Sequence, residues 1–372
     1  MLSTNTLMTP VCEGNVPSSV DKTQSVVRMI HSIYRDEKFD AVKMAITPDE
    51  FLAQGFEYGD SCTIKFSNGY TLRDVPVFSS YYVKTGYPVI IARPGNDYTK
   101  ISLNCRSLWT PAGLTSDCTV EITLDVRGKY IAVHKALGQT YSNDRRNFKS
   151  DAQFANFRPL TGGNMKENFL YRGVSPVDNQ KGRAAYANAL IKAAGIGCII
   201  DLADSEKDMQ KHLSSEGFAS EYAKELYESG RTVLLSLSTS YDTDYYREKL
   251  AKGFRHLIKF GGPAYIHCLE GKDRTGFVCT VLEALAGATY REMCADYMIT
   301  YDNYYGITRD GTPVSYDIVV DYNLDVYTAH IYGSNDASVY KFADYTQAAR
   351  KYLMRCGMSE SEVDQLVKLI TK

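Results

Sequence analysis

The feature that most constrains the fold is an alternation of apolar strand-like runs and helix-like segments after the first third of the chain. Ile196–Leu202 and Thr232–Leu237 are short, largely apolar runs, as found in strands buried on both faces of a sheet. Lys181–Ala194 and Asp244–Phe260 instead repeat apolar side chains at helical spacing. This alternation predicts an α/β domain over residues 150–372, with a central, mostly parallel sheet flanked by helices.

The first part of the chain has a different pattern. Within residues 51–140, short apolar stretches are separated by Gly, Pro, Asn and Asp, and Ser67–Tyr70 contains an Asn-Gly pair that suits a hairpin turn. We therefore expect a smaller β-rich N-terminal domain over residues 51–140, an antiparallel barrel or sandwich. Residues 1–50 are expected to form a leader and a helix, because apolar side chains recur at helical spacing over Val26–Tyr34.

Three other segments carry structural signals. The polar stretch Tyr141–Asp151 is the expected linker between the two parts. Tyr316–Tyr332 is expected to be an inserted strand pair in the α/β domain. The last helix is expected to begin at Ser359, because Glu362 three residues later completes a capping box.

Charge and hydropathy exclude several classes of protein. The 372 residues contain 42 basic and 44 acidic side chains, a net charge of −2, so a nucleic-acid binder that relies on a global basic field is not expected. No apolar run approaches about 18 residues, so we expect no membrane-spanning segment. Residues 1–20 lack the basic start and apolar core of a signal peptide, which leaves a cytoplasmic and a secreted location both open.

The nine cysteines do not form a metal or redox motif. None belongs to a C-x-x-C pair, which gives no support to a thiolate zinc site or a thioredoxin-like site. Their odd number and wide spacing argue against a disulfide framework. Most are therefore expected to be small buried packing residues, and the question is whether one of them is chemically active.

One cysteine, Cys268, lies in a loop suited to phosphate chemistry. The segment His267–Gly276 joins an expected strand, Ala264–His267, to an expected helix. Backbone N–H groups and the helix N-terminus would point at a ligand above the loop, an arrangement that binds tetrahedral anions and stabilises a thiolate. Arg274 follows Cys268 by six residues and can fold its planar guanidinium over two phosphate oxygens.

The neighbouring residues have expected roles of their own. Thr275 can donate its hydroxyl to the cysteine sulfur, and His267 is expected to order the loop through its ring N–H groups rather than act as a base. Lys272 would add positive charge for additional phosphates, whereas Glu270 would repel highly phosphorylated substrates unless it points away or pairs with Lys272. The candidate substrate-binding residues are His267, Leu269, Glu270, Gly271, Lys272, Thr275 and Gly276. A nucleotide-binding P-loop is excluded, because its first glycine would fall at Ile266.

The loop resembles the H-C-x5-R-[ST] signature of cysteine-dependent protein tyrosine phosphatases. Its Gly-Lys-Asp-Arg-Thr-Gly ending is similar to the bacterial branch that also includes lipid and phosphoinositide phosphatases. Upstream, Asn156–Arg158 with the later Gly162-Gly163 resembles N-F-R-D-L-G-G, Tyr171–Gly173 resembles Y-R-S, and Asp201-Leu202 resembles the start of D-L-R. The resemblance covers roughly residues 150–305.

The sequence departs from that branch at three positions. Pro159 replaces an acidic residue, Gly173 replaces serine and Ala203 stands where arginine is expected. These departures concern substrate contacts and leave the nucleophile in place.

The resemblance implies a two-step hydrolysis. The Cys268 thiolate attacks phosphorus to form a phosphocysteine, and water then hydrolyses it, while Arg274 and the loop amides stabilise the charge. No metal and no other cofactor is required. The leaving oxygen needs a general acid. In the resembling branch this is the loop aspartate, so the resemblance favours Asp273 as the acid. Asp242 and Asp244 are the alternatives, because they follow the strand Thr232–Leu237, where other tyrosine phosphatases carry their acid.

Three functions are therefore considered. The first is a protein tyrosine phosphatase with possible phosphoserine or phosphoinositide activity, whose partner is a phosphorylated protein or a phosphoinositide. The second is a dedicated inositol-phosphate or phosphoinositide phosphatase. The third is a catalytically silent phosphate-binding module. The sequence does not determine an oligomeric state.

Overall fold

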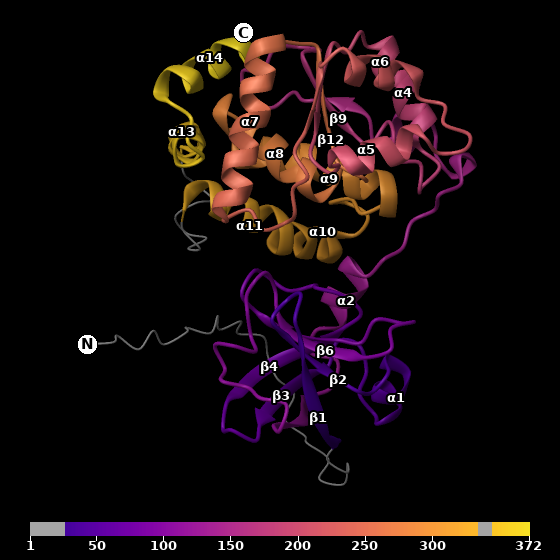
Figure 1. Cartoon of the computed structure of the whole chain (residues 1–372), viewed down its shortest axis with the longest axis vertical. Coiled ribbons are helices and arrows are strands. Elements are labelled where there is room, and N and C mark those ends of the chain that lie inside the picture. The colour runs from indigo at the N-terminus through magenta and orange to yellow at the C-terminus, as the bar shows by residue number, and fades with distance from the viewer. Residues whose placement is uncertain (1–26, 334–343) are drawn as a thin grey trace.

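The computed structural model describes residues 27–333 and 344–372. The expected leader at the N-terminus lies largely outside them. An N-terminal barrel and a C-terminal α/β part are joined by one helix and an extended connector (Figure 1).

Seven strands of the N-terminal part form a closed barrel in the order β1-β2-β6-β5-β4-β3-β7. The strands are β1 (Arg28–Asp36), β2 (Ala41–Met44), β3 (Ser61–Phe66), β4 (Thr71–Phe78), β5 (Pro88–Ile91), β6 (Thr99–Leu103) and β7 (Thr119–Val126). Every neighbouring pair is antiparallel except β4 and β5, and the pairing of β1 with β7 closes the barrel. Two helices accompany the strands, α1 (Pro48–Ala53) and α2 (Ile131–Leu137).

The helix expected over Val26–Tyr34 is wrong, because Arg28–Asp36 is strand β1. Met29 and Ile33 are buried in the barrel, whereas Ile30 is 60% exposed. Apolar side chains on the outer face hid the alternation of a strand and imitated helical spacing. The strand is formed by long-range pairing with β2 and β7, which no local pattern encodes.

The C-terminal part is built on a five-stranded sheet in the order β11-β10-β12-β9-β8. The strands are β8 (Arg158–Pro159), β9 (Leu170–Gly173), β10 (Cys198–Asp201), β11 (Thr232–Leu234) and β12 (Ala264–His267). All neighbours are parallel except β8 and β9. The expectation of a mostly parallel sheet is therefore confirmed.

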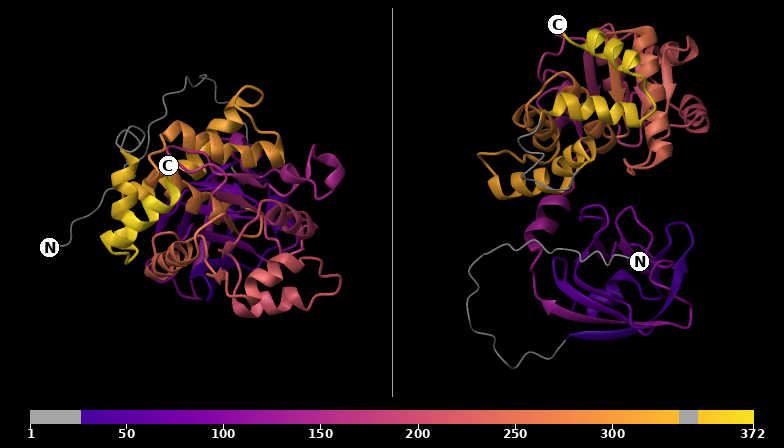
Figure 2. Two further views of the ribbon diagram at one scale, coloured as in Figure 1. Left: turned by 90° about the horizontal axis from the view of Figure 1, so that it is seen from above. Right: turned by 90° about the vertical axis from the view of Figure 1, so that its left-hand side faces the viewer.

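Helices cover both faces of this sheet (Figures 1 and 2). The helices of the C-terminal part are α3 (Asp151–Phe154), α4 (Ala184–Ala193), α5 (Glu206–Leu213), α6 (Glu221–Glu228), α7 (Asp244–Phe260), α8 (Asp273–Leu285), α9 (Tyr290–Tyr305), α10 (Pro313–Val319), α11 (Asp325–Tyr332), α13 (Tyr345–Arg355) and α14 (Glu360–Ile370), with a 3₁₀ turn η1 (Arg145–Asn147) in the connector and a π-helix η2 (Val320–Leu324). In β12, Ala264 and Ile266 face the core under α7 and α8, and Tyr265 faces the core under α4, α5 and α6. The capping box predicted at Ser359 is present.

The strand pair expected over Tyr316–Tyr332 is wrong, because α10, η2 and α11 form one helical stretch there. Tyr316, Val319, Leu324 and Tyr327 are buried at helical intervals. The β-branched run in α10 suggested strands, but packing against the rest of the α/β part overrides that weak preference.

Helix α2 on the barrel side contacts α10 of the α/β part, and the two helices lie between the two parts in Figure 1. Buried Phe78 and Val133 from the barrel side pack with Ile318 of α10. An ion pair of 2.7 Å joins Lys84 Nζ to Asp321 Oδ1. Among the described helices, none is both long and apolar enough to cross a membrane.

Candidate active site

The loop between β12 and α8 forms the floor of a pocket of about 410 Å³. Cys268 directly follows β12 and is only 3% exposed. The pocket is lined by Ser238, Thr239, Cys268, Leu269, Glu270, Asp273 and Arg274. The structure thus brings together five residues that the sequence predicted for the site. The sequence analysis missed Ser238 and Thr239, which come from the loop between β11 and α7.

A close backbone contact sets the bend of the loop. Gly271 has a φ of +64°, and a β-carbon added there would lie 2.3 Å from the carbonyl oxygen of Gly173. Gly173 itself ends β9, and a β-carbon there would lie 2.4 Å from the hydroxyl of Tyr265. The glycine that replaces the family serine at 173 therefore lies where this chain has no room for a side chain.

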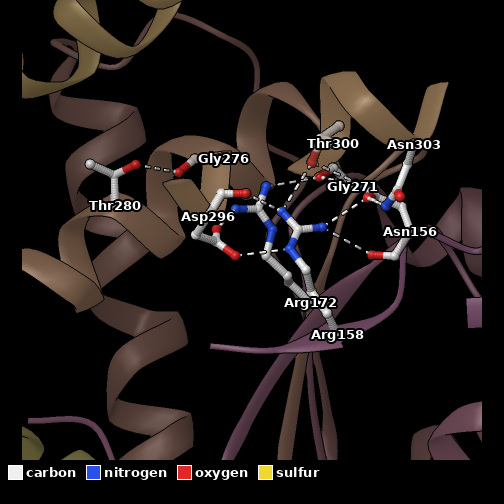
Figure 3. Close-up of polar contacts among 9 residues, drawn as sticks. All are labelled: Asn156, Arg158, Arg172, Gly271, Gly276, Thr280, Asp296, Thr300 and Asn303. Carbon is white, nitrogen blue, oxygen red and sulfur yellow. Dashed lines mark hydrogen bonds and ion pairs between the residues drawn. The ribbon is translucent and has the colours of Figure 1, made fainter. Parts of the chain in front are cut away.

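A buried ionic network supports the loop from below (Figure 3). Arg172 donates one hydrogen bond to the Gly271 carbonyl at 3.0 Å and another to Asp296 Oδ2 at 2.5 Å. Arg158 Nε donates to the other oxygen of Asp296 at 2.8 Å. Burial alone would raise the pKa of the Asp296 carboxyl, but the two guanidiniums hold it below its usual value. Asn156 also donates to the Gly271 carbonyl, at 3.3 Å.

The upstream motif residues therefore act on the loop rather than on the pocket. Asn156, Arg158 and Arg172 do not line the pocket, and each contacts Gly271, Asp296 or both. The upstream motifs that resemble the family therefore supply residues that hold the loop in place.

His267 is buried at the end of β12, next to Asp201 in the register of the sheet. Burial lowers the pKa of its imidazole to about 4, so the ring is neutral at pH 7. Its Nε2 lies 3.9 Å from Asp201 Oδ2, which is too long for a hydrogen bond. A pKa this far below neutrality makes the imidazole a weak proton acceptor, so His267 stays a predicted ordering residue and not a candidate base.

Arg274 and Thr275 follow the loop at the start of α8. Arg274 donates a hydrogen bond of 3.1 Å to the carbonyl of Leu237, so its guanidinium is held by the β11–α7 loop. The Thr275 hydroxyl is fully buried and has no hydrogen-bond partner within the described chain. The expected hydrogen bond from Thr275 to the cysteine sulfur is not formed. Gly276 of α8 packs against the ring of Tyr297 of α9.

The three candidate acids differ in position. Asp273 lines the pocket at the N-terminus of α8. Asp242 does not line it and forms an ion pair of 2.5 Å with Arg106. Burial would raise the pKa of the Asp242 carboxyl, but Arg106 holds it below its usual value. Asp244 is 89% exposed and pairs with Arg247. Of the three, Asp273 alone lies in the pocket.

The carboxylate of Glu270, which lines the pocket, is held by two neighbouring side chains. Tyr141 donates a hydrogen bond of 2.5 Å to Glu270 Oε1, and Lys272 Nζ lies 3.6 Å from Glu270 Oε2. Lys272 also lies 3.9 Å from Asp273 and donates a hydrogen bond to Tyr305 at 3.3 Å. Lys272 is therefore surrounded by acidic and phenolic partners and does not line the pocket.

The tyrosines beside the loop support it and do not form the pocket wall. Tyr304 donates a hydrogen bond of 2.7 Å to the Glu270 carbonyl and stacks on Tyr141, with ring centroids 4.6 Å apart. The guanidinium of Arg183 lies over both rings. The sequence assigned Tyr141 to a linker, and no local signal revealed that this segment docks on the loop.

The described cysteines other than Cys268 are also free thiols. Burial raises the pKa of Cys198, Cys279 and Cys356 to about 12, so these thiols stay protonated at neutral pH. They fit the packing role that the sequence predicted. Cys12 lies outside the described residues.

Comparison with known proteins gives a family match. Residues 152–372 match the model of the tyrosine phosphatase family, whereas no curated protein matches the chain.

Matching solved structures include three distant ones. An uncharacterized conserved protein from Thermotoga maritima is 15% identical, with 29% of this chain and 42% of that chain covered and a TM-score of 0.23. The core catalytic domain of the PP-IP phosphatase SIW14 from S. cerevisiae, in complex with citrate, is 16% identical, with 45% and 85% covered and a TM-score of 0.26. TpbA from P. aeruginosa is 13% identical, with 62% and 94% covered and a TM-score of 0.23.

Proposed function

The chain belongs to the tyrosine phosphatase family, and from this premise we propose that it hydrolyses phosphotyrosine esters through a phosphocysteine intermediate. The observation that carries the proposal is the shared pocket of Cys268, Asp273 and Arg274. A nucleophile, an acid and a cation around one cavity are the groups that phosphoryl transfer from an ester requires.

In the first step, the Cys268 thiolate attacks phosphorus, and the S–P bond forms as the P–O bond to the tyrosyl oxygen breaks. Asp273 gives its proton to that oxygen, which leaves as a phenol. Arg274 and the N–H groups of the loop stabilise the negative charge on the equatorial oxygens. Cys268 is only 3% exposed, so we expect a phosphate at the end of a long side chain such as that of tyrosine to reach it best.

In the second step, water attacks the phosphorus of the phosphocysteine and the S–P bond breaks. Asp273, now a carboxylate, accepts a proton from the attacking water. Inorganic phosphate leaves, and the Cys268 thiolate and the protonated Asp273 are restored. Over the two steps, the ester and water become a phenol and inorganic phosphate, and Cys268 and Asp273 return to their starting states.

The charge at the rim favours substrates with one phosphate. Glu270 lies at the pocket, and the cation that would attract a second phosphate, Lys272, is already paired with two carboxylates. A phosphoinositide with several phosphates would meet this carboxylate and not a free ammonium group. A phosphotyrosine with basic neighbours in its peptide fits the same rim better.

Kinetics on the full chain test this proposal. We expect hydrolysis of an aryl phosphate that vanadate inhibits and that Cys268→Ser abolishes. Phosphotyrosine peptides should give a higher kcat/KM than phosphoinositides. The reverse order would instead support the dedicated phosphoinositide phosphatase, and phosphate binding without turnover would support the silent module.

A further inference from the structure

The β11–α7 loop, residues 235–243, forms one wall of the pocket through Ser238 and Thr239. On its inner side, the Leu237 carbonyl accepts a hydrogen bond of 3.1 Å from Arg274, a residue that lines the pocket. The Leu237 amide donates a hydrogen bond of 2.8 Å to the Leu202 carbonyl. A shift of this loop would therefore move both the wall and the guanidinium.

The outer side of the same loop contacts the barrel. Arg106, three residues after β6, forms an ion pair of 2.5 Å with Asp242 of the loop. Its neighbour Cys105 lies beside the side chains of Thr239 and Ser240. Thr239 thus links the two sides, because it lines the pocket and adjoins a barrel residue.

The barrel turn that carries Arg106 is itself held firmly. Asn104 donates its side-chain amide to the Val83 carbonyl at 2.7 Å, and its carbonyl accepts from the Gly86 amide at 2.7 Å. Arg106 also donates to the Cys105 carbonyl at 2.9 Å. The turn that carries Arg106 is therefore hydrogen-bonded to the rest of the barrel independently of its contact with the loop.

We propose that Arg106 is a positioning residue of the phosphatase site, through which the barrel holds the β11–α7 loop in place as the pocket wall. The family match begins at residue 152, so this residue lies outside the segment that the family shares. The part of the inference that concerns substrate affinity rests on the proposed function; the part that concerns the loop does not.

A simple tether between the two parts is the competing explanation, and the chain offers a matched control for it. Lys84 and Asp321 also form an ion pair between the barrel and the α/β part, at 2.7 Å and with similar exposure. Asp321 lies in η2, away from the β11–α7 loop and from the pocket wall. Lys84→Ala therefore removes an equivalent tether without touching that loop.

The test compares Arg106→Ala, Arg106→Lys and Lys84→Ala in the full chain. Hydrogen–deuterium exchange reports the β11–α7 loop, and steady-state kinetics with p-nitrophenyl phosphate report KM and kcat. We expect Arg106→Ala to speed exchange of the loop amides and to raise KM about two- to fivefold, the range for a partly exposed ion pair. Arg106→Lys should restore both in part, and Lys84→Ala should change neither.

A double variant shows whether Arg106 acts through Asp242. Arg106→Ala combined with Asp242→Asn should exchange no faster than the more affected single variant. Equal exchange in Arg106→Ala, Lys84→Ala and the native chain would overturn the proposal. If the native chain hydrolyses no phosphomonoester, the proposed function fails, but the exchange data still decide the role of Arg106.

Discussion

Gly271 of the loop between β12 and α8 packs backbone to backbone against Gly173 at the end of β9, so closely that a β-carbon at Gly271 would lie 2.3 Å from the Gly173 carbonyl oxygen. The contact holds the loop between the sheet below it and the pocket above it. The Gly271 carbonyl accepts hydrogen bonds from Asn156 and Arg172 in the same place.

Gly271→Ala should displace the loop. The new β-carbon would overlap the Gly173 carbonyl in addition to the strain of a positive φ, so we expect loss of most phosphatase activity and a lower free energy of unfolding. Gly195→Ala is the matched control, because Gly195 has a φ of +63° and open space around it. It should cost about 1 kcal/mol in urea denaturation and leave kcat unchanged. Equal effects of the two substitutions would contradict the role of the contact.

Asp273→Asn should remove the basic limb of the pH–rate profile. The limb reports a general acid that must be protonated, and Asp273 is the candidate acid that lines the pocket. We expect kcat to fall about 10²- to 10⁴-fold on alkyl phosphates, whose leaving group needs the proton most.

Asp242→Asn is the comparison for that experiment. Arg106 holds the Asp242 carboxyl in its ionised form, so this variant should keep the basic limb. If Asp242→Asn removes the limb and Asp273→Asn keeps it, the assignment of the acid is reversed.

Glu270→Gln should change substrate preference more than rate. The substitution leaves Lys272 with one carboxylate partner, Asp273, instead of two, so more of its positive charge can attract a second phosphate. KM for a phosphoinositide should therefore fall more than KM for a phosphotyrosine peptide. The difference should shrink as the salt concentration rises, since charges near the surface are screened. An equal change in both KM values at low salt would show that Glu270 does not select substrates by charge.

Asp296→Asn should destabilise the α/β part strongly at neutral pH. The substitution leaves two buried guanidiniums, Arg158 and Arg172, without their carboxylate, at a cost of about 3–5 kcal/mol. The folded pKa of Asp296 lies below its usual value, so its contribution is complete above the unfolded pKa and is lost as the pH falls through the folded pKa.

Urea denaturation at several pH values checks this prediction. The gap in unfolding free energy between native and Asp296→Asn chains should be largest near pH 7 and narrow toward acid pH. Glu167→Gln, which removes the exposed partner of Lys372, should leave the unfolding free energy unchanged at both ends of the range. A gap that widens toward acid pH would contradict the ionised state of Asp296.

The parts of the fold with local signals could be predicted from the sequence. The helix Asp244–Phe260 and the capping box at Ser359 follow from side-chain spacing and from a hydrogen-bond pattern within four residues. The candidate phosphatase loop could be singled out for the same reason, because its motif lies within ten consecutive residues, five of whose predicted site residues line one pocket.

The remaining features depend on contacts between distant segments. Strand β1 is held by partners far along the chain, and its exposed Ile30 obscured the alternation that would have revealed it. Ser238 and Thr239 reach the pocket only because β11 lies two strands from β12. Tyr141 looked like part of a polar linker, since nothing near it in sequence encodes its contact with Glu270.

The closure of the barrel also limits how its described strands can recognise other molecules. Each of the seven strands has a neighbour on both sides, so the barrel has no strand with a wholly free edge. This closure disfavours recruitment of a peptide by extension of the sheet, the mode that many adaptor domains use. We therefore expect any selectivity that the barrel adds to come from the outward side chains of its strands and turns.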